Sequence, residues 1–315
     1  LKEKEEFWEI LLFSWLWQTI FFTFDRWEII RIIKKKYINL ETKIIKINEN
    51  YYIPFDNNDI ADHFIFSKSW NHLIFSKIIQ FQNIRVKKFF NKSKIKFEKH
   101  KIKKRTKFKY YPKSNAKIFI KDLYLPRKLK IKLNLSYLQF NMFYNSPLIK
   151  KSKIDSFARS LKLNKTEDKD KFHNFLNNYL PKSIPSVYVE GFSNLKSAYK
   201  KINWPNKPKV IFTSIAHYSD PLFRYYVANK KKIGSRLVIL QHGGKYGYTR
   251  TRLAEFYENR ICDRFLTWGN YFDSEKKYRS LFTSTIAEEK KFLIKTKQKK
   301  ILITTNEFPF VLGRA

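Results

Sequence analysis

Cysteine is nearly absent from this sequence: Cys262 is the single one in 315 residues. A lone cysteine excludes a disulfide framework and a cysteine-rich zinc site. Acidic residues are also scarce, with 27 Asp and Glu against 65 Lys and Arg, so the formal net charge is +38. Hydrophobic residues still make up 43% of the chain, which is enough for a sizeable core and argues against a wholly disordered protein.

Arginine is rare among the basic residues, and this weakens the most obvious interpretation of the charge. Only 14 of the 65 basic residues are Arg, which leaves 51 Lys. Proteins that read nucleic acid use the arginine fork as well as charge. Ile, Asn, Phe and Tyr are abundant together with Lys, a bias typical of an AT-rich genome. We therefore expect no nucleic-acid partner and keep nucleic-acid binding as an alternative.

Much of the positive charge lies in residues 85–117, where 15 Lys or Arg stand against a single acid, Glu98. Three interpretations stay open: a solvated surface insertion, a patch that contacts anionic lipid headgroups, or a nucleic-acid contact. We favour the surface insertion, because a run of like charges is usually solvated.

The most apolar stretch is residues 7–24, and its length is near the lower limit for a membrane span. We favour a buried amphipathic helix, because polar side chains within the stretch would be costly in lipid. A membrane span is the alternative. The less apolar side of the helix is expected to carry Glu9, Ser14, Gln18 and Asp25.

From about residue 117, short apolar runs alternate with helical segments, a pattern that favours a parallel α/β sheet. The expected strands are residues 116–120, 186–189, 210–213, 237–240 and 265–267, and the expected helices are 161–179, 192–202, 219–231 and 250–261. Nearer the N-terminus we expect helices at 7–37 and 60–84 and short strands or extended turns at 43–47 and 51–55.

Glycine is absent before Gly191, and three of the seven glycines fall in the turn QHGGKYG at residues 241–247. The turn follows an expected strand, so it lies at the carboxyl edge of the sheet, where open α/β folds bind ligands. The amides of Gly243 and Gly244 would favour an anion, and His242 would act as a general base or cationic contact. A purely structural turn is an equal alternative. The pattern is neither GxGxxG nor a Walker A motif, so neither a dinucleotide nor a P-loop NTPase is indicated. We expect no cofactor and no metal.

Polar residues at other expected strand ends converge on the same edge and make a cleft plausible. Glu190 and Ser214 each follow an expected strand, and His217 lies in the loop after Ser214. Glu190 is a candidate acid, with a helix-start acid as an equal alternative. Asp220, which precedes a proline, is more typical of a helix N-cap. Asp263 precedes its strand, so its position places it at the opposite edge of the sheet.

The turn and its surroundings resemble the bacterial surface-carbohydrate transferases related to retaining β-Kdo transferases, GT-B-like proteins of capsule and lipopolysaccharide assembly. The resemblance rests on QHGGKYG, on VIFTSIAHYSDPLFRYYVA and ICDRFLTWGN around it, and on the N-terminal FWEILLFSWLWQTIFFTFDRW and DHFIFSKSWNHLIF. It runs from about residue 7 to 310, apart from the basic segment. It implies a buried helix at 7–24 and an α/β, GT-B-like fold, with a Rossmann-like parallel sheet, an N-terminal helical region and a truncated second domain.

The resemblance also implies how the chain is divided. The expected parts are an N-terminal helical part of the first domain at 1–84, a basic insertion or loop at 85–117, the Rossmann-like part of the first domain at 118–295 and the first strand of the second domain at 296–315. Carried onto matching positions, it implies catalytic roles for Glu190, Asp263 and His242. The expected substrate contacts are Gln241, Gly243, Gly244, Tyr246 and Gly247, together with Ser214 from its strand end.

The expected function is transfer of a sugar, Kdo-like or similar, from a nucleotide-sugar donor such as CMP-Kdo to an oligosaccharide or lipid-linked acceptor. A retaining transfer needs a carboxylate at the anomeric carbon and a base or acid for the acceptor hydroxyl. Glu190 and Asp263 would share those roles, while His242 or the glycine amides hold the donor's charged groups.

Three alternatives remain: a polyol-phosphate transferase of the teichoic-acid type, a basic nucleic-acid-binding protein, and a protein that spans a membrane at residues 7–24. We expect a cytoplasmic enzyme, with peripheral contact to the anionic inner membrane left open. We also expect the chain to be inactive without the rest of the second domain.

Overall fold

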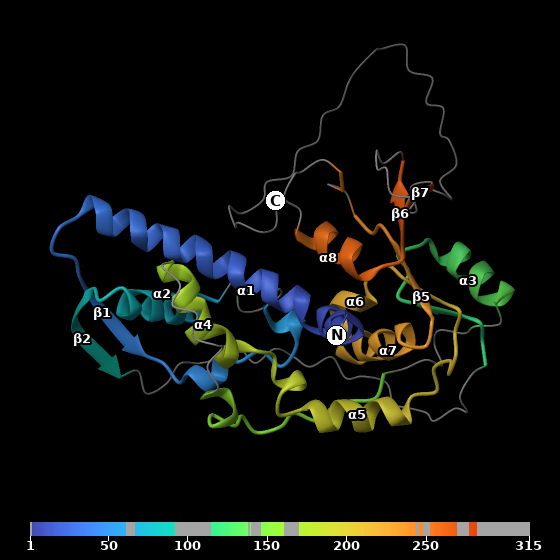
Figure 1. Cartoon of the computed structure of the whole chain (residues 1–315), viewed down its shortest axis with the longest axis horizontal. Helices are drawn as coiled ribbons and strands as arrows, with labels where there is room; N and C mark the ends of the chain where they lie inside the picture. Colours follow the sequence, from blue (N-terminus) through green and yellow to red (C-terminus); the bar gives the residue numbers. More distant parts are fainter. Residues whose placement is uncertain are drawn as a thin grey trace, which may run out of the picture.

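The computed structural model describes residues 2–60, 67–91, 115–137, 139, 146–160, 170–243, 246–247, 253–269 and 277–281. Within this part of the chain, five parallel strands form the larger sheet in the order β3-β4-β5-β6-β7 (Figure 1). The strands are β3 (Ile118–Lys121), β4 (Val210–Thr213), β5 (Arg236–Leu240), β6 (Arg264–Trp268) and β7 (Tyr278–Leu281). The prediction of a parallel α/β sheet is confirmed, and the architecture is consistent with a Rossmann-like fold.

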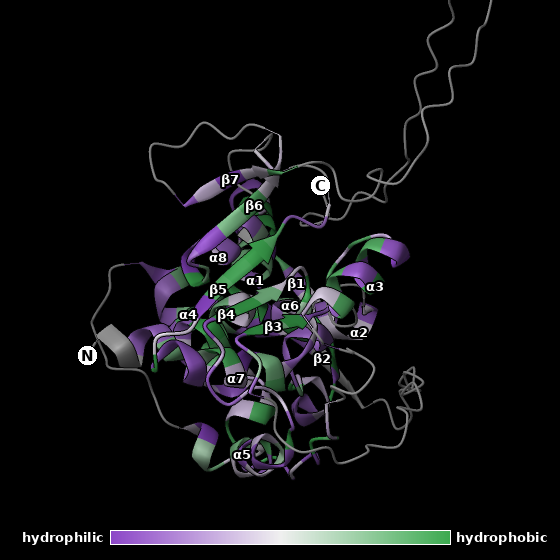
Figure 2. Ribbon diagram, turned by 90° about the vertical axis from the view of Figure 1, so that its right-hand side faces the viewer, coloured by the Kyte–Doolittle hydropathy of each residue, from purple (hydrophilic) through white to green (hydrophobic). Residues whose placement is uncertain are grey.

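Helices connect successive strands of this sheet, as parallel pairing requires. They are α3 (Arg127–Ser136), α4 (Lys171–Ser183) and α5 (Phe192–Lys201) between β3 and β4, α6 (Ala216–Ser219) and α7 (Pro221–Lys231) between β4 and β5, and α8 (Leu253–Ile261) between β5 and β6. The middle of the sheet is apolar, as Figure 2 shows, because helices bury it and solvent does not reach Ile211, Leu237, Ile239 and Phe265.

A second, two-stranded sheet lies at the other end of the molecule (Figure 1). Its parallel strands β1 (Glu41–Lys46) and β2 (Arg85–Asn91) are joined through the 3₁₀ helix η1 (Glu49–Tyr52) and α2 (Lys68–Phe81). The first residues of the expected basic insertion therefore form a strand. The extended segment expected at 51–55 is wrong at its start, where η1 buries Tyr52. Residues 92–114 and 282–315, which include the expected strand of a second domain, lie outside the described part of the chain.

The long helix α1 (Lys2–Lys36) connects the two halves of the structure. Its first turns carry Ile10 and Leu11 into a hydrophobic core around the larger sheet, which we call the sheet core. Its later turns carry Phe22 and Trp27 into a second cluster with α2 and α4, which we call the helical core. By length and composition, α1 could cross a membrane, but half of its apolar window is buried inside the protein.

Two of the four residues predicted on the less apolar side of α1 are buried, and the other two form ion pairs. Ser14 and Gln18 are buried, at 1% and 6% exposure, and Gln18 Nε2 donates to Ser14 Oγ over 3.3 Å. Glu9 and Asp25 instead form ion pairs, with Arg260 and with the adjacent arginine. Helix packing on both sides of α1 explains the difference, because α7 and α8 cover one end and α2 and α4 the other.

The strand predicted at residues 186–189 is also wrong: Ser186–Tyr188 form the 3₁₀ helix η5. Pro185 begins the segment, and the amides of Ser186 and Val187 donate to the carbonyls of Pro54 and Phe55 rather than to a neighbouring strand. The segment therefore fills the sheet core with Val187 without joining the sheet. The helix predicted at 161–179 begins at Lys171 within the described residues, and it continues through Pro181.

Candidate functional site

The QHGGKYG turn begins where β5 ends, and it folds back on His242. Gly247 has a φ of 75°, a left-handed conformation that favours glycine, and its amide donates to Glu255 Oε2 over 3.1 Å. The reversal places the Tyr246 hydroxyl 3.2 Å from His242 Nδ1. The turn thus presents a histidine at the carboxyl edge of the sheet, as predicted, with Tyr246 as its neighbour. Gly244 lies outside the described residues.

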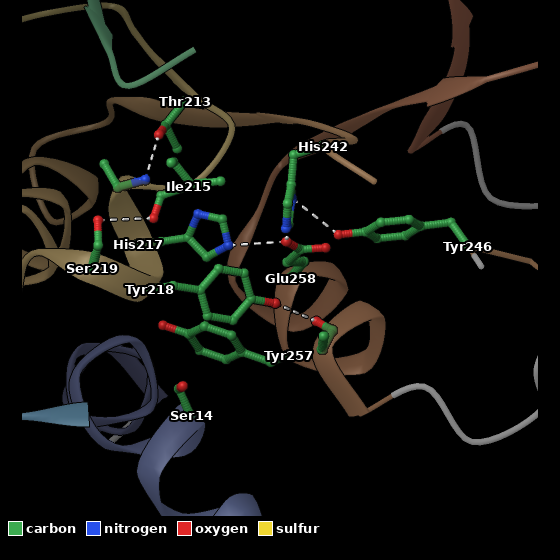
Figure 3. Close-up of polar contacts among 12 residues, drawn as sticks. Ser14, Thr213, Ile215, His217, Tyr218, Ser219, His242, Tyr246, Tyr257 and Glu258 are labelled. Carbon is green, nitrogen blue, oxygen red and sulfur yellow. Dashed lines mark hydrogen bonds and ion pairs between the residues drawn. The ribbon is translucent and has the colours of Figure 1, made fainter. Parts of the chain in front are cut away.

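Two short helices bring a second histidine and a carboxylate to the same place (Figure 3). His217 on α6 has Nε2 3.0 Å from Oε1 of Glu258 on α8, and the same oxygen lies 3.6 Å from His242 Nδ1. The side chains of His217 and Glu258 are 1% and 0% exposed, whereas His242 is 23% exposed. One buried carboxylate oxygen therefore lies between two imidazoles, and solvent reaches only the outer one to a substantial degree.

Burial sets the protonation of the inner part of this cluster. Burial, together with the Arg224 guanidinium, lowers the pKa of His217 to about 3, so its imidazole is neutral near pH 7. A neutral His217 can donate its Nε2 proton to Glu258. Burial and the charge of Glu258 raise the pKa of Tyr218 well above its usual value, so Tyr218 stays a phenol. Its ring packs against His242, with centroids 5.8 Å apart.

A fully buried arginine holds the backbone of α6 in place. Arg224 Nη1 donates to the carbonyls of His217 and Tyr218, over 2.9 and 2.8 Å, and its Nε donates to the Tyr188 hydroxyl over 2.7 Å. At the start of α6, the Ala216 amide donates to a threonine hydroxyl at the end of β4. These bonds fix the position from which His217 reaches Glu258.

Gln241 and Ser214, two of the residues predicted to contact substrate, form hydrogen bonds within the protein. The Gln241 side chain accepts from the Trp268 amide over 2.8 Å and donates to the Gly243 carbonyl over 2.9 Å, so it ties the end of β5 to the end of β6. Ser214 is fully buried, and its Oγ accepts from the Tyr124 amide over 2.9 Å. Contacts between these side chains and a substrate stay a prediction.

Glu190, a predicted catalytic acid, does not lie at a strand end, because the segment before it is η5. Its carboxylate forms a two-pronged ion pair with Arg159, over 2.6 and 2.7 Å, and both side chains are nearly inaccessible. Burial raises the pKa of Glu190, but the hydrogen bonds and charge of Arg159, together with backbone hydrogen bonds from Glu190 and Asp155, hold the pKa below its usual value. The geometry gives Glu190 a structural role, and a catalytic role stays a prediction.

Asp263 lies at the amino edge of the sheet, as its position before β6 predicted. Its Oδ2 accepts from the Leu237 amide near the start of β5 over 2.6 Å and pairs with Lys231 over 2.9 Å. His242 lies beyond the opposite end of β5, a strand length of roughly 15 Å away. Asp263 and His242 are therefore not brought together.

Glu258 was not predicted as a site residue, and His217 was predicted only to lie in the loop after Ser214. The available signal was the spacing of Glu255 and Glu258, three positions apart in a helix that follows the glycine-rich turn of an acid-poor chain. Among the described residues, no group of three or more His, Cys, Asp or Glu could hold a metal ion.

Comparison with known proteins identifies the family. The model of the LIC12162 family transferases matches residues 1–314. The chain belongs to the LIC12162 family transferases. This membership supports an enzyme that transfers a chemical group and agrees with the predicted transferase class. No curated protein and no solved structure matches the chain.

Proposed function

We propose that this family member is a glycosyltransferase that moves a sugar from a nucleotide-sugar donor, CMP-Kdo or a similar one, to an oligosaccharide or lipid-linked acceptor. Membership of a transferase family supports group transfer, and the parallel sheet supports a GT-B-like plan. The observation that carries the proposal is the partly exposed His242 beside the buried Glu258, at the carboxyl edge of the sheet.

His242 is proposed as the base that activates the acceptor. A sugar hydroxyl is a poor nucleophile until its proton is removed, and imidazole accepts protons near neutral pH. As the acceptor oxygen bonds to the anomeric carbon, its proton passes to His242. The nucleotide phosphate leaves with the electron pair of the broken carbon–oxygen bond.

Glu258 is proposed to stabilise the imidazolium that forms on His242. Its Oε1 lies 3.6 Å from Nδ1, and a carboxylate removed from solvent attracts a nearby cation more strongly than one in water. His217, neutral and hydrogen-bonded to the same oxygen, holds the carboxylate in position. The pair would thus stabilise the imidazolium that forms on His242 during transfer.

The proposed partners follow from this chemistry. A nucleotide-sugar donor carries phosphate charge, which backbone amides of the glycine-rich turn are suited to bind. We place the activity in the cytoplasm, at or near the inner membrane, because a lipid-linked acceptor would lie there. Nucleic acid has no part in the proposal.

The test uses the full-length protein and measures nucleotide release from CMP-Kdo, from nucleotide hexoses and from a CDP-polyol. His242→Asn and Glu258→Gln are each expected to lower kcat by about 10²- to 10⁴-fold, since each removes part of the base. The control is His173→Asn, an exposed histidine on α4, which should retain wild-type kcat.

Wild-type turnover by His242→Asn would refute the base assignment. Turnover with the CDP-polyol alone would replace sugar transfer by polyol-phosphate transfer. Glu190→Gln and Asp263→Asn complete the series. If both variants keep wild-type activity, the predicted catalytic roles of the two acids are wrong. Their roles are then structural, through the ion pairs with Arg159 and Lys231.

A further inference from the structure

A strongly basic surface lies at the end of the molecule that carries the two-stranded sheet. We call residues 31–46 and 85–87 the basic tip; they hold eight Lys or Arg and a single acid, Glu41. The end of α1 and both strands of the small sheet meet there (Figure 1), and Lys34 Nζ donates to the Gln82 carbonyl over 2.7 Å. The tip is therefore built from segments that are distant in sequence.

Large apolar side chains are exposed on the same surface. Ile38 is 91% exposed, Ile32 is 56% exposed and Tyr37 is 53% exposed. Asn39 follows with a φ of 61°, a left-handed conformation that turns the chain sharply from α1 toward β1. Ile38 thus lies at the turn, two residues after the run Lys34–Lys36.

Internal ion pairs neutralise only part of the charge. Arg31 pairs with Glu28, and Arg85 and Lys87 share Glu41. Among the described residues, no acid forms an ion pair with Lys36 or Lys43. The surface therefore combines a net positive charge with apolar groups that gain from leaving water.

We propose that the basic tip docks on an anionic lipid surface. The lysines would contact the headgroups while Ile38, Tyr37 and Ile32 enter the boundary between headgroups and acyl chains. Lysines beside exposed apolar side chains are the combination that such a boundary binds. A nucleic-acid surface would use the lysines but would gain nothing from Ile38. Binding of the tip to lipid does not depend on the proposed sugar transfer.

The experiment measures sedimentation of the full chain with vesicles of phosphatidylcholine, alone or with 30% phosphatidylglycerol. We expect binding to the anionic vesicles only, and weaker binding at high salt. Neutralising Lys34, Lys35 and Lys36 together to Gln should lower the partition coefficient about 100-fold, at about fivefold per charge. Ile38→Asn should lower it about tenfold.

The matched control neutralises Lys196, Lys200 and Lys201 on α5, which makes the same charge change away from the tip. It should bind almost as the wild type does. Equal partitioning of the tip and α5 variants would overturn the proposal, as would equal binding to neutral and anionic vesicles. Binding of a single-stranded oligonucleotide that needs the three lysines, with vesicle binding unaffected by Ile38→Asn, would assign the tip to nucleic acid instead.

Discussion

Glu258 is the residue on which the candidate site depends. A carboxylate with no solvent exposure is costly unless polar neighbours compensate it, and here one oxygen meets both His217 and His242. A neutral donor such as His217 supplies a hydrogen bond without adding a second buried charge. His242 is the more exposed of the two histidines. A substrate can therefore reach its imidazole and change its charge by proton transfer.

The lowered pKa of His217 predicts a pH dependence of stability. Its pKa is about 3 in the folded protein against 6.5 for an ordinary histidine, so between these values the unfolded chain binds more protons. The contribution of neutral His217 to the free energy of unfolding is complete above pH 6.5. It is lost as the pH falls toward 3, at a rate of at most about 1.4 kcal/mol per pH unit. Urea unfolding at pH 7 and pH 5 measures it.

His217→Gln should reduce the difference in unfolding free energy between those two pH values, because the amide does not titrate. His173→Gln, which removes an exposed histidine, should leave the difference unchanged. If His217→Gln lost as much stability on acidification as the wild type, the neutral state of His217 would not be the cause.

Among the elements, the turn after β5 depends on backbone conformation. Gly247 has a positive φ, whereas Gly243 has not, and a Cβ at Gly243 would meet no described atom within 4 Å. The position of Gly247 therefore favours glycine for its positive φ, whereas the position of Gly243 has room for a side chain and no positive φ. Of these two, Gly247 is the one whose positive φ the reversal of the chain toward His242 requires.

Gly247→Ala is expected to destabilise the protein by about 1–2 kcal/mol, because an L-residue is strained at positive φ. Gly243→Ala should change stability by less than about 0.5 kcal/mol. Thermal and urea unfolding of the two variants, side by side, measure the difference. Equal destabilisation would show that the positive φ is not what the turn requires.

For the whole molecule, α1 makes the two hydrophobic cores interdependent. Leu11 is fully buried in the sheet core, where the hydroxyl of Tyr257 donates to the carbonyl of the preceding residue, Ile10. Ile74 is fully buried in the helical core, and α1 packs on its helix, α2. Because α1 is a continuous helix that packs in both cores, loss of packing in either core is expected to destabilise the other.

Leu11→Ala and Ile74→Ala should each destabilise the protein by about 2–5 kcal/mol, the range for emptying a buried aliphatic site. Because α1 joins the cores, each variant should unfold in a single transition, whether followed by circular dichroism or by tryptophan fluorescence. Ile38→Ala, at 91% exposure, should change stability by less than about 0.5 kcal/mol. Two separate transitions in either core variant would show independent cores.

The amino-acid sequence predicted the larger sheet well wherever a strand is a continuous apolar run. β4 has its predicted bounds, and β5 and β6 are each within one residue of theirs. It missed β2, whose Lys-Lys-Phe-Phe pattern reads as a basic segment, and it predicted a strand for η5, whose backbone bonds go to a distant loop. Local pattern thus failed where lysines interrupt a strand and where an apolar segment bonds to a loop rather than to a strand.

The candidate site also has features that the local sequence predicts and features that depend on distant contacts. The sequence by itself determined the glycine-rich turn and the placement of His242 and Tyr246, because turn geometry and strand ends are local properties. Only the tertiary structure decided that Glu258 meets His217, 41 positions earlier in the chain, and that Glu190 pairs with Arg159. Burial and charge pairing act across the fold, so no local spacing of residues reveals them.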